Sequence, residues 1–441
     1  MKNICILILY LIIISSHSEG QIKTFSEDES IKTAMENSRD IKIAESRIAG
    51  NKAKVDETSS FFLPQLRFTS GYTRLSNVGP FVIKLPFSPV PVQISDAIVN
   101  SYSFRLSLTQ PLFTGNRLTS LRNSGSFVEK ASEEDFIIEK NNIAANVRIA
   151  YWSFYKAKLI KKISDENVSM SELHVADTRN FMNNGLATRS DLLKLEVQLS
   201  NAKLQFLEAS NNLELSKITF NKTLGIPLET KSEIEISNQE FTFASPDLKQ
   251  LLNEAFNNRS ELKSSAYRIK SFESNVTAAK SGYYPYVYLG AGYNLANPNS
   301  RIQPQVNRFD GTWDAGIFLS WDFWNWGSTS AQVIQNEQTL IQGKLSRAQL
   351  MESIELEVNQ NYLNLNFLKE KAEVSNLTTG QSEENYRVIR EKYNAQLATS
   401  TELADAETLL FQAKTNYANA VADYRIALIK LYKSAGRKLY P

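Results

Sequence analysis

The feature that most constrains this chain is an internal duplication. The segment "NNGLATRSDLLKLE" in the first half returns as "NAQLATSTELADAE" in the second, and the shared Leu-Ala-Thr triplets lie 211 residues apart. Further upstream, Pro64 corresponds to Pro285 at an offset of 221. A sequence duplicated at this scale indicates two copies of one supersecondary unit. The offset changes between about Thr73 and Phe104, a Pro-rich stretch in which a loop tolerates a difference in length.

The repeat predicts the domain limits. We expect a signal peptide at 1–18, a first repeat at 19–230, a connector at 231–246 and a second repeat at 247–441. The N-terminal segment contains one lysine, an apolar run too short to span a bilayer as a helix, and small polar residues, as secretory signal peptides do. Cleavage after Ser18 is preferred, and cleavage after Gly20 is the alternative. The only cysteine, Cys5, falls in this segment, so a mature chain would have no disulfide and no thiolate.

Each repeat is predicted to contain one β-hairpin, at 65–112 and at 285–324. Apolar and polar residues alternate in "YSFRLSLTQ" and "TWDAGIFLSWDF", the period of a two-faced strand. Strands of about ten residues that end in dense aromatics, as in "SWDFWNWG", are long enough to cross a bilayer at a tilt. We expect four strands in the chain. Four strands cannot close a barrel, so two, three or four chains would have to combine.

The rest of each repeat is predicted to be helical. One helix is expected at about 26–60 and its counterpart at about 247–281. Proline is absent from Leu118 to Asn183 and from Ser328 to Lys438, and apolar residues recur there every three or four positions. At about 1.5 Å per residue, roughly 66 residues form a helix of about 100 Å. The two duplicated segments lie between such runs, which predicts an antiparallel helical hairpin with a tip near 185 and another with a tip near 396.

Helix capping is expected just after each tip. Thr188 or Ser190 can cap the returning helix of the first hairpin, and Asp191 places an anion in its first turn. In the second hairpin the corresponding residues are Thr399, Thr401 and Glu402.

The composition excludes several classes of function. Lysine and arginine total 49 against 47 acidic residues, spread along the chain, so no basic tract indicates nucleic-acid binding. No HExxH motif, cysteine pair or phosphate-binding loop occurs, and the GxG of "LGAGYN" lies within a predicted strand. His174 is the only histidine outside the signal peptide, and we expect it on a helix surface. The chain is therefore predicted to be no enzyme and to need no metal or cofactor.

Taken in order, the signal peptide, helix, strand hairpin and long helical hairpin resemble the TolC-type outer-membrane channel-tunnel family over essentially the whole mature chain. The segments that carry the resemblance are "FFLPQLRF", "LTQPLFTGN", "GLATRSDLL", "LATSTELADAE" and "YRIALIKLYKSAG". It implies an α+β membrane protein: a homotrimer in which four strands per chain make one twelve-stranded β-barrel in outer-membrane lipid. The helices would form a tunnel across the periplasm, with the connector at its equator.

The resemblance also implies a function. The protein would be the exit duct of a tripartite efflux or type I secretion system, passing drugs, other small molecules or proteins from an inner-membrane pump and its periplasmic adaptor to the exterior. The residues alone leave open a soluble periplasmic coiled-coil structural or adaptor protein. An outer-membrane enzyme would need an inward catalytic cluster that the sequence does not provide.

Candidate site residues follow from the resemblance. The helical tips would dock the adaptor; their residues are Gly185, Leu186, Ala187, Thr188, Asp191, Gln396, Leu397, Ala398, Thr399 and Glu402. Helix capping alone is the alternative role for these positions. Gln396 stands where the family usually has glycine, so we expect the second tip to bend or dock differently.

A pore constriction is implied as well. An acidic ring narrows the tunnel in the best-studied branch of the family, and the matching positions here are Arg387 and Arg390. They lie three residues apart and therefore share a helix face. They imply a cationic constriction. The alternative is an exposed network of ion pairs with Glu383, Glu384 and Glu391.

Overall fold

The computed structural model describes residues 23–95, 97–235, 243 and 246–441. The predicted signal peptide and part of the predicted connector lie outside these residues. The chain forms two compact units. The helical unit comprises the chain up to Ala44, Asp135–Leu262 and Gln349–Pro441, and the sheet unit comprises Glu45–Glu134 and Lys263–Ala348. Both units draw on both repeats.

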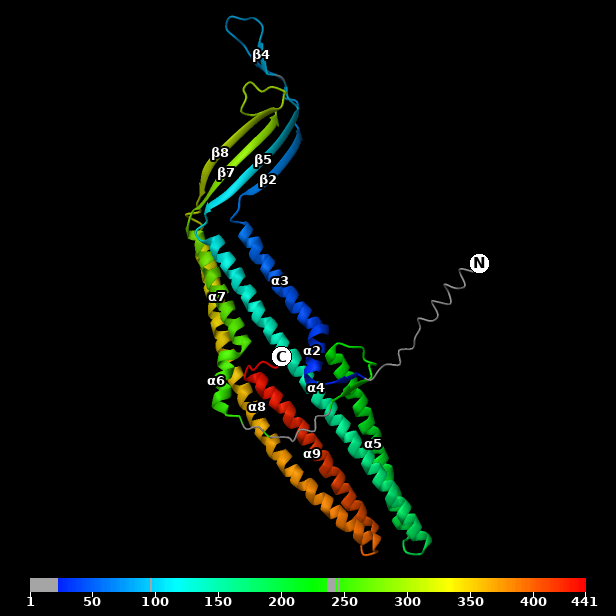
Figure 1. Cartoon of the computed structure of the whole chain (residues 1–441). Coiled ribbons are helices and arrows are strands. Elements are labelled where there is room, and N and C mark those ends of the chain that lie inside the picture. Colours follow the sequence, from blue (N-terminus) through cyan, green and yellow to red (C-terminus); the bar gives the residue numbers. More distant parts are fainter. Residues whose placement is uncertain (1–22, 96, 236–242, 244–245) are drawn as a thin grey trace, which may run out of the picture. The chain divides into compact units, whose positions relative to one another are not determined.

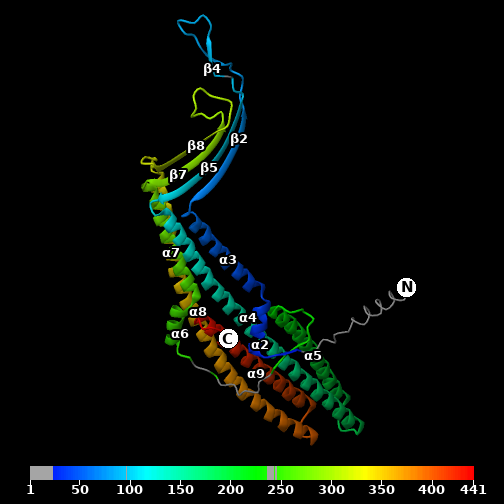
Figure 2. The ribbon, with the colours of Figure 1, turned by 45° about the horizontal axis from the view of Figure 1, so that its top comes forward.

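The sheet unit contains one antiparallel sheet of four strands in the order β2-β5-β7-β8 (Figure 1). The first repeat contributes β2 (Gln65–Arg74) and β5 (Asn100–Phe113), and the second contributes β7 (Tyr286–Asn297) and β8 (Asp310–Ser320). The two hairpins join through β5 and β7, which pair antiparallel. Figure 2 shows the same order of strands from a second direction. The open edges of the sheet are β2 and β8.

The register of the strands separates an apolar face of the sheet from a polar face. Leu106 pairs with Tyr293 on the apolar face, whereas the next residue, Arg105, forms an ion pair with Asp314 at 3.0 Å on the polar face. The predicted alternation of period two is confirmed, because side chains two apart along a strand share a face. Large exposed side chains of the apolar face include Leu66, Phe68, Phe104, Leu106, Ile317 and Leu319.

The expectation of only four strands was wrong. In the Pro-rich stretch, β3 (Phe81–Ile83) pairs antiparallel with β4 (Val92–Ser95). In the helical unit, β1 (Lys23–Phe25) pairs parallel with β6 (Ser232–Ile234), which lies within the predicted connector. Strands of three or four residues carry too little periodicity to be predicted. The parallel pair also joins segments about 200 residues apart, which no local pattern shows.

The two first helices of the repeats are each divided in two, which corrects the prediction of continuous helices. At Ser38 and at Arg259 the backbone becomes extended, and the amide groups of both residues still bond to the preceding helix. Ser38 also accepts a hydrogen bond from the Asp40 amide at 3.1 Å, so it caps the helix that follows. The observed helices are α2 (Glu27–Asn37), α3 (Arg39–Ser60), α6 (Leu248–Asn258) and α7 (Ser260–Lys280).

The long helices have the predicted length. Both α4 (Arg117–Asn183) and α8 (Ser328–Asn394) contain 67 residues. The returning helices are α5 (Arg189–Leu224) and α9 (Ser400–Ser434), and Figures 1 and 2 show each beside its partner. Among the residues that the structure describes, no helix combines the length and the hydrophobicity needed to cross a lipid bilayer.

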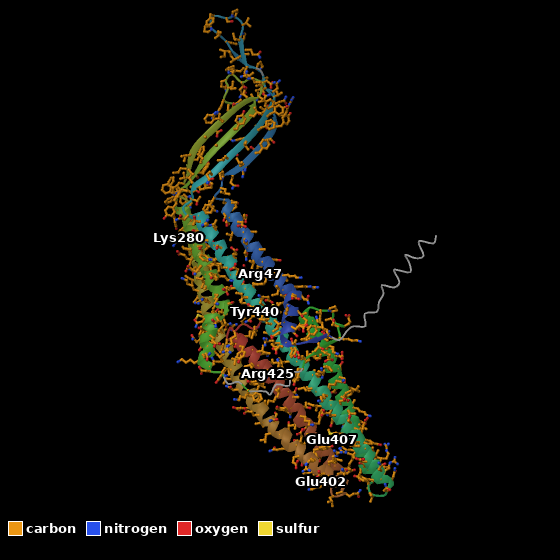
Figure 3. All side chains as sticks on the ribbon, in the orientation of Figure 1. Arg47, Lys280, Glu402, Glu407, Arg425 and Tyr440 are labelled. Atoms are coloured by element: carbon orange, nitrogen blue, oxygen red, sulfur yellow. The ribbon has the colours of Figure 1, made fainter. Side chains whose placement is uncertain are left out.

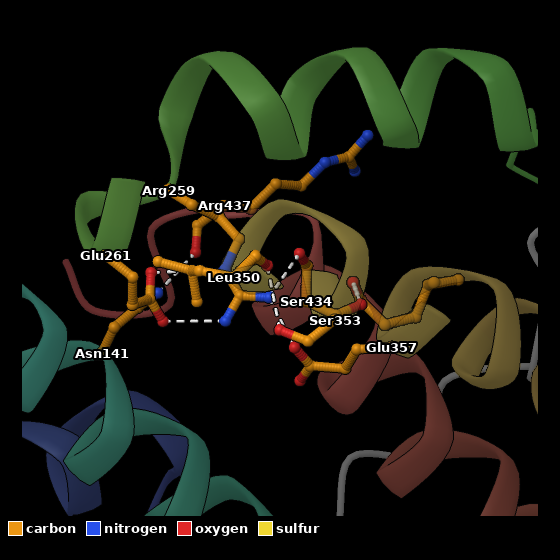
Figure 4. A network of polar contacts seen from close by, with 9 residues as sticks. Asn141, Arg259, Glu261, Leu350, Ser353, Glu357, Ser434 and Arg437 are labelled. Atoms are coloured by element: carbon orange, nitrogen blue, oxygen red, sulfur yellow. Dashed lines mark hydrogen bonds and ion pairs between the residues drawn. The ribbon is translucent and has the colours of Figure 1, made fainter. Parts of the chain in front are cut away.

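A buried arginine anchors the break of the second repeat (Figure 4). The Arg259 guanidinium is bonded to Glu261 at 2.8 Å and to Glu357, and it donates to the carbonyl of Ser434 at the end of α9. Burial alone would lower the pKa of Arg259, but the two carboxylates raise it above its ordinary value, so the guanidinium stays charged. In the first repeat Ser38 stands at the position of Arg259, and the neighbouring Asn37 donates from its neutral amide to the carbonyl of Leu224, at the end of α5, at 3.3 Å.

Candidate functional site

The tip of each helical hairpin is a tight turn built by one backbone motif. After α4, the amide of Gly185 donates to the carbonyl of Met182 at 3.0 Å, and that of Leu186 donates to Phe181 at 2.8 Å. Gly185 has a φ of +75°, the left-handed conformation that ends a helix in this motif. The α4 carbonyls are thereby satisfied and the chain reverses within a few residues.

The second tip has the same turn, which corrects the expectation that Gln396 changes the bend. The amide of Gln396 donates to the carbonyl of Tyr393 at 2.9 Å, and that of Leu397 donates to Lys392 at 2.7 Å. Gln396 has a φ of +65°. A residue with a Cβ atom pays about 1 to 2 kcal/mol for this conformation. The hydrogen bonds of the turn therefore hold glutamine in a conformation that glycine adopts without strain.

Both returning helices begin with a complete capping box. Thr188, not Ser190, is the cap of α5: its side chain accepts from the Asp191 amide at 3.2 Å, and Asp191 accepts from the Thr188 amide at 3.1 Å. Thr399 and Glu402 repeat this reciprocal pair in α9. Hydrogen bonds from Thr188 and then from Ser400 lower the pKa of Asp191. These bonds satisfy amide groups that a helix N-terminus otherwise leaves unpaired.

Hydrogen bonds also join the first turns of α5 and α9, which the sequence did not reveal. Ser400 donates its hydroxyl proton to Asp191 Oδ1 at 2.8 Å, and Lys194 Nζ donates to Thr401 at 3.2 Å. Asp191 thus uses one oxygen in its own cap and the other on the neighbouring hairpin. Its acidic character could be read from the sequence, but its second partner lies 209 residues away. The two tips are therefore linked to each other.

An apolar side chain is left exposed at each tip. Leu186 is 59% exposed and Leu397 is 79% exposed. Each directly follows the left-handed residue of its turn, so the turn directs both side chains away from the hairpin cores. Ala187 and Ala398 are only partly exposed. The structure therefore presents two small apolar points, one on each hairpin, beside capped and hydrogen-bonded helix ends.

Arg387 belongs to an exposed network of ion pairs, as one of the two sequence interpretations describes. Its guanidinium contacts Glu384 at 2.6 Å and Glu391 at 2.8 Å, both on α8. The predicted third carboxylate, Glu383, pairs instead with Lys414 of α9 at 3.5 Å. Arg390 is exposed and forms no ion pair with any residue that the structure describes. The two arginines therefore differ in how far local carboxylates neutralise them.

Polar side chains of α4 form a buried ladder against α8 and α9. Thr178 shares a hydrogen bond with the Tyr393 hydroxyl at 2.6 Å, and Ser171 donates to Glu407 of α9. Ser171 and Thr178 lie seven residues apart and so occupy one helix face. Figure 3 shows Glu407 on α9, set back along that helix from Glu402 near the tip. Interhelical packing beside the tips is thus partly polar.

His174 occupies the middle of this ladder, which corrects its predicted place on the helix surface. Its side chain is only 2% exposed and its Nε2 shares a hydrogen bond of 2.9 Å with the Tyr386 hydroxyl. Burial first, and the nearby Arg390 second, lower the pKa of His174 to about 4 against an opposing effect of Asp177. Histidine at this site is a neutral hydrogen-bonding residue at neutral pH.

Glu407 is an acidic residue of this ladder, and it is completely buried, with 0% exposure. Burial raises its pKa, and the hydrogen bond from Ser171 only partly opposes this. Its second oxygen, Oε2, finds no partner among the described residues. An unpaired buried carboxylate oxygen favours the protonated form of the acid. The sequence of α9 gives no indication that position 407 faces another hairpin.

Among the described residues, no group of three or more histidine, cysteine, aspartate or glutamate side chains is arranged to hold a metal ion. The acidic residues at the tips serve as helix caps, and the buried His174 is bonded to a tyrosine rather than to a carboxylate. The residues near the tips therefore form two exposed apolar points and a buried interhelical seam.

Comparison with known families identifies the chain. The model of the outer membrane efflux protein family matches residues 30–225 and 251–437, which include both strand hairpins and both tips. The chain belongs to this family. The two matched segments correspond to the two halves of the duplication, so the family relationship spans both repeats. The protein is thus an outer-membrane efflux protein whose helical part lies in the periplasm, and the soluble periplasmic alternative is set aside. The family points to a channel rather than to a catalyst.

Two curated relatives illustrate the similarity. The probable efflux pump outer membrane protein TtgC of Pseudomonas putida is 19% identical over 420 residues, covering 93% of this chain and 82% of the relative. The probable outer membrane lipoprotein SilC of Salmonella typhimurium is 20% identical over 409 residues, covering 92% of this chain and 84% of SilC. The matches thus extend over nearly the whole chain at low identity.

Solved structures share the fold. The outer-membrane channel OprN matches with a TM-score of 0.77 at 16% identity, covering 94% of this chain and 91% of OprN. VceC of Vibrio cholerae matches with a TM-score of 0.76 at 14% identity, covering 94% of this chain and 96% of VceC. The predicted fold class, long helical hairpins with a four-strand contribution to an outer-membrane channel, is confirmed.

Proposed function

We propose that this protein is the exit duct of a tripartite efflux or type I secretion system. It receives drugs, other small molecules or proteins from an inner-membrane pump through a periplasmic adaptor. The observation that carries the proposal is the pair of matched, capped tips, each exposing one leucine, in a member of the outer membrane efflux protein family. The fold of one hairpin does not require the other hairpin to have a matching tip. A ring of docked adaptors, in contrast, needs the same contact to be repeated.

The open sheet supports assembly into a homotrimer. No strand among the described residues pairs with the outer edges of β2 and β8, and an exposed edge is stabilised by pairing with another strand. Four strands are too few for a barrel, and transmembrane barrels have at least eight. Three copies joined edge to edge make a twelve-stranded barrel with the apolar face towards lipid. The polar face, with the Arg105–Asp314 pair, would then line the duct.

The helices of the helical unit carry exposed apolar stripes that fit a second copy of the chain. Along α8 the exposed side chains recur at intervals of seven, four, seven and three residues, a heptad pattern. On α5 three further exposed side chains follow the same spacing. Their members are Leu356, Leu363, Phe367, Val374 and Leu377 on α8, and Val197, Leu204 and Leu207 on α5. Subunit association would bury both stripes.

The tips are the proposed adaptor-docking surface. In a trimer, two tips per chain give six quasi-equivalent points. Leu186 and Leu397 would supply the apolar contacts, and Thr188 and Thr399, with their acidic partners, hold the helix ends that present them. Arg387 and Arg390 are proposed to lie near the narrowest part of the duct. Glu384 and Glu391 together outweigh the single charge of Arg387, so Arg390 would supply the positive charge that no ion pair with a described residue offsets.

A pair of variants tests the docking role. Leu186→Asp combined with Leu397→Asp adds charge to the apolar points while both capping boxes stay intact, so trimers should assemble but export should fail. Leu228→Asp, at another exposed leucine of the helical unit outside the tips, is the matched control. Assembly is read from the mass of the protein in detergent, and export from accumulation of a fluorescent dye in cells. Unimpaired export by the double variant would contradict the docking role.

A further inference from the structure

A cavity of about 440 Å³ lies at the base of the sheet, within the sheet unit. Its walls come from the ends of all four strands and from the turns that lead to the helices. The volume falls within the range of small-molecule sites. The strand residues at its floor are on the polar face, because Gln65 pairs with Thr109 and Tyr286 pairs with Ser320 in the register that contains Arg105 and Asp314.

Aromatic rings form one wall of this cavity. Phe61, Tyr284 and Tyr286 line it, and all three rings are partly exposed. Tyr286 is stacked on Tyr288, with ring centroids 5.4 Å apart and planes inclined by 29°. Tyr288 in turn stacks on Phe318 at 5.2 Å and 20°. Nearly parallel rings on an otherwise polar face offer a flat surface on which a planar aromatic ligand can stack.

Two unpaired charges of opposite sign also line the cavity. Arg117 and Asp322 are exposed, and neither forms an ion pair with any described residue. Other cations nearby are occupied: Lys280 pairs with Glu337 at 3.1 Å, and Arg122 lies over the Phe62 ring. The two charges therefore remain available to a ligand that carries both a carboxylate and an ammonium group.

The duplication shows that these charges are not part of the shared scaffold. At the offset of 211 residues, Arg117 corresponds to Ser328, and Asp322 corresponds to Pro111. The backbone around them is repeated: Gly115 has a φ of +59°, and its counterpart Trp326 has a φ of +55°. A Cβ atom at Gly115 would lie 2.9 Å from that of Tyr284, so the glycine lets this turn close against the aromatic wall. The same turn works without either charge.

We propose that this cavity is a binding site for planar aromatic zwitterions. Arg117 pairs with the carboxylate of the ligand, Asp322 pairs with its ammonium group, and Tyr284 and Tyr286 pack on its ring system. The site deepens the proposed function, on which it rests in one respect: the polar face must line the duct for the ligand to be cargo. The cavity itself lies within one chain.

Norfloxacin, a fluorescent planar zwitterion of suitable size, is the probe. We expect saturable binding to the purified full-length protein in detergent, followed by fluorescence anisotropy. Arg117→Gln should weaken norfloxacin binding about tenfold, because a charge-assisted bond is lost. The same substitution should leave binding of the norfloxacin ethyl ester unchanged, since the ester has no carboxylate. Asp322→Asn should weaken both compounds but spare N-acetylnorfloxacin, and Tyr284→Ala should weaken all three.

Arg122→Gln, on the same helix but outside the cavity lining, is the matched control and should leave every affinity unchanged. No saturable binding, or equal loss of acid and ester on Arg117→Gln, would overturn the site. The mass of the same sample in detergent reports assembly separately. A trimer that exports but does not bind norfloxacin removes only the cavity proposal, whereas a monomer that binds it removes only the proposed assembly.

Discussion

At the scale of single residues, the buried seam beside the tips contains two titratable groups. The pKa of one is lowered and the pKa of the other is raised. His174 faces Tyr386 and Arg390 of α8 and Asp177 of its own helix, and its pKa falls. Glu407 faces Ser171 of α4, and its pKa rises. Burial is the main cause of both shifts, because it disfavours the charged form of either group. The contributions of His174 and Glu407 to stability therefore depend on pH in opposite senses.

The stabilising contribution of buried His174 should weaken in acid. The pKa of His174 is about 4 in the folded protein and 6.5 ordinarily, so its contribution is present above pH 6.5 and is lost as the pH falls towards 4. Between pH 7 and pH 5 the loss amounts to about 2 kcal/mol. We expect His174→Gln to reduce the acid sensitivity of the unfolding midpoint measured by circular dichroism. An unchanged slope between these pH values would contradict the buried, neutral histidine.

The contribution of buried Glu407 to stability should change with pH in the opposite sense. A raised pKa means that the folded protein holds the proton of Glu407 more tightly than the unfolded chain does, so its contribution is present below the ordinary value of 4.5 and is lost as the pH rises. Glu407→Gln removes the charge and keeps a group that can accept from Ser171. We expect this variant to be more stable than the wild type at pH 8 and nearly as stable as it at pH 4. Thermal unfolding measures both differences. A variant that is less stable at pH 8 would show that the carboxylate is ionised and satisfied.

At the scale of elements, each repeat uses the same devices with different residues. The tips share one turn and one kind of capping box, although glycine occupies the left-handed position in the first and glutamine in the second. The helix breaks are likewise equivalent, but Arg259 with its two carboxylates stands where the first repeat has Ser38, and there the neighbouring Asn37 bonds to the end of α5 instead. Equivalent backbone geometry therefore does not require equivalent side chains.

The left-handed position predicts a reciprocal pair of effects at the tips. A Cβ atom added at Gly185 meets no neighbour within 4 Å, so Gly185→Ala costs only backbone strain, about 1 kcal/mol. Gln396→Gly should relieve a similar strain in the second tip. Hydrogen exchange of the Leu186 and Leu397 amides, which close the two turns, measures each effect locally. Faster exchange on Gly185→Ala and slower exchange on Gln396→Gly are expected; equal rates in both variants would show that the strain is absent.

At the scale of the whole molecule, the apolar face and the two apolar stripes are surfaces that a single chain leaves uncovered. Lipid covers the first and further copies of the chain cover the second in the proposed trimer. The charged residues near the second tip then surround the duct, because a three-fold assembly repeats each of them. The properties of the proposed trimer would thus depend on residues that show no special feature on a single chain.

The apolar face predicts which substitutions block insertion. Leu106→Arg near the middle of the bilayer should cost on the order of 2 to 4 kcal/mol and reduce the yield of detergent-stable oligomer. Ser107→Arg, one residue further on the polar face, is the matched control and should be tolerated far better. Yields are compared after refolding into lipid vesicles. Equal yields would mean that the assignment of the two faces is reversed or that the sheet does not meet lipid.

The proposed position of Arg387 and Arg390 near the narrowest part of the duct predicts a weak preference for anions. Arg387 is neutralised by Glu384 and Glu391, so Arg390→Gln should shift the reversal potential towards cations more than Arg387→Gln does. The shift should diminish at high salt as screening increases. The measurement uses a planar bilayer under a salt gradient. Strong cation selectivity of the wild type, or no shift on Arg390→Gln, would place these arginines away from the pore.

The local features of this fold were readable in the amino-acid sequence. Strand alternation, the length of α4 and α8, and the position of both tips follow from periodicity and from proline-free runs, which act between near neighbours. The duplication located the second tip even though Gln396 replaces glycine.

Contacts between distant segments were decided only in the tertiary structure. The burial of His174 and Glu407, the bond from Ser400 to Asp191, and the pairing of β1 with β6 each join residues from separate parts of the chain. No periodic pattern distinguishes a polar residue that faces water from one that faces a polar partner on another helix. The choice depends on which helices pack together, and the free energy of burial and hydrogen bonding sets that choice.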